Sequence, residues 1–271
     1  MAIDWTSGYS ATWRVRYIDE ATWTPGGDLA AVDAMAVQRA QGGCIESGSI
    51  TVTADPGQPP DAGWYRIEMT ARQGDRSEVV QVATMWLTPG QRVLSHGVEQ
   101  VTMSATSVIE RAQRVKYANG DHAPKGVDGA AFVGDMLRRC TPAPVVVDGS
   151  FALTDHIVFA LDGDVLSAAW QVLNAHGWCL LIDGDGTIHV APLPTVSTET
   201  LDLTQYEPTR DEADGVVTYS YTREWLPDVR PYTLLDVRPT PGAEYRPARV
   251  DAQTFTLGLG VTVGETLKEA T

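Results

Sequence analysis

Two alternating segments joined by a tight turn constrain this chain more than any other feature. Residues 64–71 alternate between apolar and polar side chains, residues 73–76 (Gln-Gly-Asp-Arg) provide a turn, and residues 78–87 return with apolar side chains on both faces. A period of two indicates strands, so the pair predicts an antiparallel hairpin. A returning strand that is apolar on both faces is expected to lie inside an assembly or beneath another element.

Three further segments of the first hundred residues alternate in the same way, and turns rich in glycine and proline separate them. These segments are residues 12–18, 49–53 and 98–103. Strands at this spacing are typical of a small antiparallel barrel or sandwich, so residues 1–103 are predicted to form a first β-barrel domain. We interpret the alanine-rich residues 28–41 as a loop with some helix, because glycine pairs flank them.

Residues 104–197 are predicted to form an α/β domain, because the apolar period changes there to that of helices. Thr106 or Ser107 followed by Glu110 resembles a capping box before a short helix that ends at Arg114. In such a box the hydroxyl accepts a hydrogen bond from the first helical turn, and the glutamate reaches back to the capping residue. The pattern therefore predicts where this helix begins.

Two longer helices and a hairpin are predicted in the same domain. Asp128 is expected to cap a helix over residues 129–140. Asp162 or Asp164 begins the next helix, and Gly177 fits the position just after its end. The predicted strands are residues 145–147, 178–182 and 187–190, the last two forming a hairpin over an Asp-Gly turn, and residues 192–200 are a predicted linker.

The remaining residues, 198–271, return to strand patterns. Residues 216–221, 232–237 and 253–259 are predicted strands. They are too few to form a core alone, so we expect them to complete a second β-barrel with other segments or with another chain. We interpret residues 265–271 as a helical stub or a flexible end.

The acidic composition restricts the partners of this chain. The formal net charge is −15, and such a surface repels phosphate backbones, which disfavours sequence-specific nucleic-acid binding. Two interpretations stay open. The charge serves only solubility, or it forms a wall past which nucleic acid slides without sticking.

The sequence also bears on where the chain is made. No apolar run approaches the roughly 18 residues that a membrane helix needs. Residues 1–5 lack a basic region followed by an apolar stretch, so no secretory signal is predicted. We therefore expect no membrane span and synthesis in a host cytoplasm.

The histidines and cysteines predict no catalytic or metal site. No HExxH, GxSxG, Walker A or GxGxxG pattern occurs. Cys44, Cys140 and Cys179 lie far apart and form no CxxC pair, so free buried thiols are expected. We predict that the chain is not an enzyme and has no catalytic residue, metal or cofactor. The scattered histidines are His96, His122, His156, His176 and His189.

Two Asp-Gly clusters are candidates for calcium ligands. Residues 162–164 and 183–186 supply carboxylates and sharp turns. The spacing of an EF-hand loop and its closing glutamate are absent. A helix cap and a hairpin turn explain both clusters, and we favour that interpretation.

Tryptophan is frequent, with eight residues in this chain. Most are expected in the core. Trp23, beside Thr-Pro-Gly, and Trp225, before Leu-Pro, lie in irregular segments. These two are the candidate residues for anchoring a partner protein.

The order of these elements resembles the tail-hub family of long-tailed and contractile phages, which includes late-control and baseplate-hub proteins. The similar stretches are residues 45–53 leading to 63–67, the helix and hairpin of 170–190, and residues 249–263. The resemblance implies an α+β, mostly β fold in which two tail-tube-like antiparallel β-barrels flank an α/β insert.

The resemblance further implies a homotrimer at the centre of a virion tail tip. Three chains would supply six barrels, which adapt a six-fold tail tube or distal tail ring to a three-fold tip. The expected partners are a distal tail or tail tube protein, the tape measure protein and a separate tip or fibre protein. The ring would line the conduit for DNA and tape measure.

Three alternatives stay open beside this structural role. The chain is the hub of a phage-derived contractile injection system, a distal-tail or receptor-binding carbohydrate module, or a cell-wall hydrolase. A carbohydrate module predicts exposed aromatic residues clustered on one loop face. A hydrolase predicts loss of turnover when one histidine or acidic residue is replaced.

Overall fold

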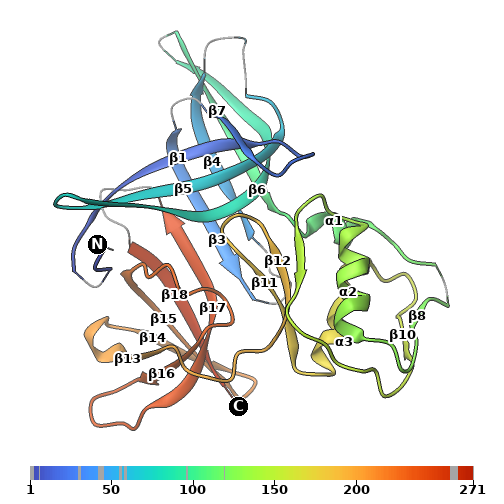
Figure 1. Ribbon diagram of the computed structural model, residues 1–271. Helices are drawn as coiled ribbons and strands as arrows, with labels where there is room; N and C mark the ends of the chain where they lie inside the picture. The colour runs from blue at the N-terminus through green and yellow to red at the C-terminus, as the bar shows by residue number, and fades with distance from the viewer. Residues whose placement is uncertain are drawn as a thin grey trace.

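The computed structural model describes residues 3–5, 7–29, 32–41, 46–54, 57, 60–95, 97–118, 120–256 and 262–270. It is mostly β, with 54% strand and 11% helix. A large sheet runs the length of the molecule, and a smaller α/β insert lies beside it (Figure 1). Within the described ranges, no helix has the length and apolar character needed to cross a membrane.

The first β region contains the predicted hairpin. Its strands are β1 (Ser10–Ile18), β2 (Pro25–Asp28), β3 (Val32–Ala40), β4 (Glu46–Ala54), β5 (Gly63–Gln73), β6 (Arg76–Ser95) and β7 (Val98–Ser107). β5 and β6 pair antiparallel around a turn in which Gly74 has a φ of +59°. That left-handed conformation suits glycine because it lacks a Cβ atom. β6 is twice as long as the predicted strand and also pairs with β7 along its second half.

The prediction of a loop with some helix over residues 28–41 is wrong. Residues 32–40 form β3, which pairs with β4 on one side. Met35 and Val37 are buried while Ala34, Ala36 and Gln38 are exposed. The alternation is present in the sequence, but alanine occupies the exposed positions and hides the contrast between the two faces.

The insert follows the predicted order of helices and strands. Its elements are α1 (Glu110–Arg114), β8 (His122–Ala123), α2 (Gly129–Arg138), β9 (Val145–Val147), β10 (Ile157–Val158), α3 (Val165–Asn174), β11 (Trp178–Ile182) and β12 (Ile188–Pro192). β11 and β12 form the predicted hairpin, and β9 pairs parallel with β12. The Asp128 carboxylate accepts hydrogen bonds from the backbone N–H groups of Ala130 and Ala131, which confirms it as the cap of α2.

Two details of helix termini differ from the predictions. The capping box before α1 is wrong, because Thr106 and Ser107 still belong to β7 and no side chain caps α1. Asp164 caps α3 as expected, through the backbone N–H of Ser167. α3 ends at the capping residue Ala175, so Gly177, with a φ of +68°, stands one position later than predicted.

The last β region holds more strands than predicted. They are β13 (Glu199–Asp202), β14 (Thr209–Ala213), β15 (Val216–Glu224), β16 (Leu234–Arg238), β17 (Arg246–Thr256) and β18 (Thr262–Glu269), with a 3₁₀ turn at Leu203–Gln205. The prediction of a helical stub or flexible end over residues 265–271 is wrong. β18 pairs with both β15 and β17, because Val263, Glu265 and Leu267 alternate inward. Residues 257–259 of a predicted strand lie outside the described residues, as do Cys44 and His96.

The two β regions form one sheet. The strand order is β14-β15-β18-β17-β3-β4-β7-β6-β5-β1-β2, and β13 and β16 branch from β17. The antiparallel pairing of β17 with β3 joins the two regions edge to edge. In the part of the chain that is described, the sheet stays open, with β14 and β2 at its ends, so neither region closes into a barrel.

Three apolar clusters fill the spaces between these elements. One fills the insert, one the interior of the first β region, and one the last β region. Trp225, Phe255 and Val263 come from the last region but belong to the core of the first. Trp64 belongs to the insert's core and packs against Trp86 at 5.2 Å between ring centroids. The three parts of the chain therefore share their interiors.

Candidate assembly surfaces

The insert is fixed to the first β region by the turn between β11 and β12. The backbone carbonyl of Asp185 accepts hydrogen bonds from Arg66 Nη2 and from Trp23 Nε1, each at 2.9 Å. Thr84 Oγ1 donates to the carbonyl of Gly184 at 2.9 Å. Charged and neutral donors from β5, β6 and the β1–β2 loop thus satisfy the turn's carbonyls, as buried polar groups require.

Glycine is required at position 184. A Cβ atom there would overlap the carbonyl oxygen of Gln81 on β6. One face of the strand that the sequence marks as apolar on both faces therefore meets the insert of its own chain through Thr84 and Trp86, and the other face buries Met85 in the core of the first β region. The prediction that this strand lies beneath another element is confirmed.

The two Asp-Gly clusters act as a helix cap and a docking turn. Asp164 caps α3. The Asp183 carboxylate contacts Arg230 and lies 3.1 Å from His189 Nε2, while Asp148 lies 2.7 Å from His189 Nδ1. The two carboxylates face opposite nitrogens of the ring, so they do not converge on one ion. Across the described ranges, no three His, Cys, Asp or Glu residues are grouped to hold a metal.

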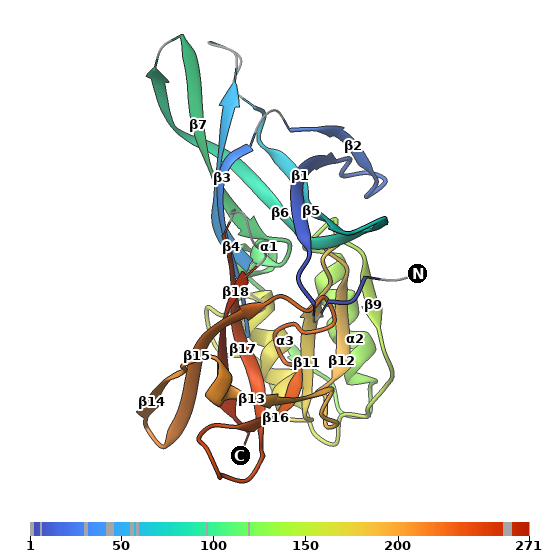
Figure 2. The ribbon, with the colours of Figure 1, turned by 90° about the vertical axis from the view of Figure 1, so that its left-hand side faces the viewer.

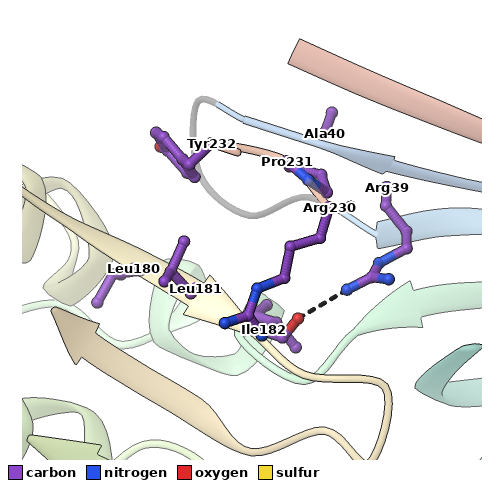
Figure 3. Close-up of a pocket in the computed structure, with 8 residues that line it drawn as sticks. All are labelled: Arg39, Ala40, Leu180, Leu181, Ile182, Arg230, Pro231 and Tyr232. Atoms are coloured by element: carbon purple, nitrogen blue, oxygen red, sulfur yellow. Dashed lines mark hydrogen bonds between the residues drawn. The ribbon is translucent and has the colours of Figure 1, made fainter. Parts of the chain in front are cut away.

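A small pocket marks the place where three parts of the chain meet (Figure 3). β3, β11 and the loop of residues 230–232 line it, and Arg39 Nη2 donates to the carbonyl of Ile182 at 2.7 Å. Its volume of about 20 Å³ is room for roughly one water molecule. Burial raises the pKa of the neighbouring Cys179 thiol to about 12. The pocket is therefore a small gap where parts of the chain pack together, and it is too small for a ligand site.

A buried charge network crosses the last β region, and the sequence reasoning missed it. Glu265 accepts hydrogen bonds from Arg223 Nε at 2.7 Å, from the Tyr221 hydroxyl at 2.6 Å and from Gln253 Nε2 at 2.7 Å. Arg223 also contacts Glu199 at 3.0 Å. Burial lowers the pKa of Arg223, but the neighbouring Glu265, Tyr221 and Glu199 outweigh it and raise the pKa. The only indication of this network in the sequence is that Arg223 and Glu265 occupy positions of β15 and β18 at which the alternation points side chains inward.

The two tryptophans proposed as partner anchors have different surroundings. Trp225 is 1% exposed and packs edge-on against Phe255 at 5.3 Å, so the prediction that it anchors a partner is wrong. Trp23 is partly exposed, its ring lies tilted against that of Trp64 at 5.5 Å between centroids, and its indole N–H donates to the backbone carbonyl of Asp185. Trp23 anchors the insert of its own chain, and a contact with a partner protein stays a prediction.

Exposed apolar side chains gather near the end of the β6–β7 hairpin. Val93, Leu94 and Val98 are 47%, 69% and 40% exposed. The free edge of the sheet at β14 is different, because all its residues are exposed and Arg210, Asp211 and Glu212 lie in sequence there. Charged residues on an edge strand oppose further strand pairing. The hairpin end is thus a more suitable contact point than the β14 edge.

Comparisons with other proteins identify the fold. No protein-family model matches the chain, and no curated protein matches it. The solved structures that resemble it include the following three. A tail protein from Neisseria meningitidis MC58 has 14% identity and a TM-score of 0.66, over 96% of this chain and 97% of that one. The 43 kDa tail protein of prophage MuSo2 from Shewanella oneidensis has 8% identity and a TM-score of 0.66, over 94% and 97%.

The third structure comes from a secretion apparatus. It is an E. coli component of the type VI secretion system that exhibits structural similarity to the T4 bacteriophage tail proteins gp27 and gp5. It has 8% identity and a TM-score of 0.59, over 90% of this chain and 74% of that one. The resemblance to the tail-hub family is therefore confirmed at the level of the fold, and the chain has the fold of phage tail proteins.

Proposed function

We propose that this chain is a structural tail hub that forms a homotrimeric ring at the tail tip of a virion. The observation that carries the proposal is the pairing of β17 with β3, which makes two β regions into one continuous sheet. One chain then supplies two β units, so three chains supply six. Such a ring matches a six-fold tail tube or distal tail ring on one side and a three-fold tip on the other.

In this proposal each open β region closes into a barrel-like unit against neighbouring copies. Residues 1–103 and 198–271 are the two units, and residues 104–197 are the insert between them. The partners are a distal tail or tail tube protein, the tape measure protein and a tip or fibre protein. The ring lines the conduit for DNA and tape measure, and the chain acts by assembly rather than by catalysis.

A hub of a contractile injection system is the second candidate, and the likeness to a type VI secretion component supports it. A carbohydrate module has less support. Among the described aromatic residues, the exposed ones are Tyr17 and Tyr245, which lie on different β regions and form no cluster. A sugar-binding face needs stacked, accessible rings.

The oligomeric state of the protein, measured as its native mass in solution, tests the proposal. The full chain should sediment or scatter as a trimer, alone or when mixed with its tail partners. A chain that stays monomeric in the presence of those partners contradicts the hub assignment. The two hub candidates differ in whether genomic DNA is found in the isolated particle.

A further inference from the structure

The end of the β6–β7 hairpin is apolar on both of its faces. Val98 lies opposite Ser95 in the antiparallel register, and Val93 stands two residues before Ser95, so the two valines share one face. Leu94 lies between Val93 and Ser95 in the chain and therefore points to the other face. It is 69% exposed. A hairpin that is apolar on both sides is not covered by lying flat on a surface, so its burial requires a groove that contacts both sides.

This hairpin end projects from the molecule. β5 pairs with β6 only from Arg76 to Leu87, and the pairing of β6 beyond that point is with β7. Figure 2 shows the two strands extending to the top of the view. We call Val93, Leu94 and Val98 the hairpin end. Its three side chains are exposed because no described part of the chain packs over them.

A groove on the insert is the matching concave surface. It has a volume of about 640 Å³ and lies between α2 and the segments around β8 and β10. Phe132 and Met136 of α2 line it, together with Tyr117 and Phe159, whose ring centroids are 5.0 Å apart. Aromatic residues and methionine are enriched in the cores of protein interfaces. We call the surface lined by these four residues the insert groove.

Exposed apolar side chains extend the insert groove at its rim. Val158 lies opposite His122, which lines the groove, so the two residues share a face. The carbonyl of Ala160 accepts a hydrogen bond from the Tyr117 hydroxyl, which brings the next residue, Leu161, to the same rim. Val158 and Leu161 are 66% and 77% exposed. The insert therefore presents an apolar surface that is open to a partner.

Both surfaces are balanced in charge, although the chain carries a net charge of −15. At the hairpin, Arg92 lies 3.7 Å from Glu99. Two copies of so acidic a chain repel each other where their acidic surfaces meet, so a contact between copies needs surfaces without net charge. The insert groove meets this condition as well. Its lysine, arginine and aspartate residues are two cations and two anions, Lys116, Arg139, Asp121 and Asp135.

The hairpin end and the insert groove lie on different parts of the molecule. Figure 1 shows the β6–β7 hairpin at the top and β8 and β10 at the right-hand side, so one copy does not fill its own groove. In a closed ring of three identical chains, each chain contributes two different patches that mate head to tail. A projecting apolar end and an apolar groove that face in different directions fulfil this requirement.

We propose that the hairpin end of one copy inserts into the insert groove of the next copy; this rests on the ring proposed above. The occupant of the groove is thus a second copy of this chain. Leu94 contacts one wall of the groove, and Val93 and Val98 contact the other. The flexible side chain of Met136 adapts to the side chains that enter. The same contact repeats at each of the three junctions of the trimer.

A disulfide between neighbouring copies tests this contact. Cys140 lines the insert groove, and L94C introduces a thiol at the hairpin end. Oxidation of L94C with copper phenanthroline should join each introduced thiol to Cys140 of the next copy. Three such bonds give a covalent trimer on a non-reducing gel. L94C/C140S should give no covalent trimer, and neither should V196C, which places its thiol at an exposed valine outside both surfaces.

Native mass gives a second measurement that needs no cysteine. L94D and V158D/L161D place carboxylates on exposed residues, so thermal unfolding should match that of the unsubstituted chain. Each variant alone should need at least tenfold more protein to form a trimer, while the control V196D assembles normally. An equimolar mixture of the two variants retains one intact hairpin end and one intact groove. It should therefore form a 1:1 pair and grow no further.

Three results overturn the inference. L94C that gives no covalent trimer would show that the hairpin end does not reach the groove. Covalent dimers that persist in L94C/C140S would show that hairpin ends pair with each other. A trimer that both aspartate variants leave intact would show that the ring closes through other surfaces, and the hub proposal would stand. If the unsubstituted chain forms no trimer, alone or with its tail partners, the proposed function fails instead, so that mass is measured first.

Discussion

Phe255 on β17 lies directly opposite Val37 on β3, and both side chains are 1% exposed. This pair joins the two ends of the chain, because one residue comes from the last β region and the other from the first. Their side chains share the core of the first β region with Trp225. The hub proposal requires the two β regions to form one sheet, and this contact lies where the two regions join.

Replacing Phe255 should destabilise both β regions together. F255A is expected to lower the free energy of unfolding by about 3–5 kcal/mol, because it removes a fully buried aromatic ring and leaves a cavity. Urea unfolding followed by tryptophan fluorescence measures the change. T256A, an exposed neighbour on the same strand, should change it by about 0.5 kcal/mol or less. A loss below about 1 kcal/mol for F255A would show that the junction does not hold the regions together.

Adding one methyl group at position 184 should loosen the insert. G184A drives a Cβ atom into the carbonyl of Gln81, and overpacking of this kind costs typically 1–3 kcal/mol or more. Thermal unfolding and limited proteolysis between residues 193 and 198 would report it. G27A, where a Cβ atom meets nothing within 4 Å, is the matched control. Equal stability of the two variants would mean that the turn does not dock on β6.

Removing one partner of the buried Arg223–Glu265 pair should lower the free energy of unfolding more than removing both partners. E265L leaves the Arg223 guanidinium buried without its main partner, at a cost of about 3–5 kcal/mol. The double variant R223M/E265L should lose less than the sum of the two single variants. E212L removes an exposed partner of Arg210 on β14 and should be nearly neutral. Additive single losses in a double-mutant cycle would contradict this coupling.

Acid should remove the stabilisation that Asp202 provides. The hydrogen bond from Arg238, together with Thr204, lowers the pKa of Asp202 from 3.8 to about 2. A pKa lower in the folded than in the unfolded state gives stability that is present above about pH 4 and is lost as the pH falls toward 2. The stability difference between the unsubstituted chain and D202N should therefore shrink over that range. A difference independent of pH between 6 and 2 would contradict the assignment.

Much of the local structure could be predicted because its determinants are close in sequence. The hairpins around residues 73–76 and 183–186 follow from alternation and turn residues. Asp128 and Asp164 cap helices because their carboxylates reach backbone N–H groups two or three residues away. The prediction failed at β3 because alanine occupies its outward positions, and at β18 because the charged Glu265 occupies an inward position. In both strands the contrast between apolar and polar residues is too weak to identify a strand.

The sites depended on contacts between distant segments. Trp225 stands in an irregular stretch before Leu-Pro, which suggested an exposed anchor, yet the core of a different β region buries it. The Arg223–Glu265 pair forms only because β15 and β18 lie side by side. No pattern within either segment predicts that these two strands pair.

By itself, the sequence determined the two hairpins, the two longer helices of the insert and the absence of the common catalytic motifs, because these depend on periodicity and on turn chemistry within a few residues. Only the tertiary structure decided that β17 pairs with β3 and that the insert covers β6. Strand pairing between distant segments is set by the burial of complementary faces. The sequence of an edge strand does not specify which other strand will pair with it.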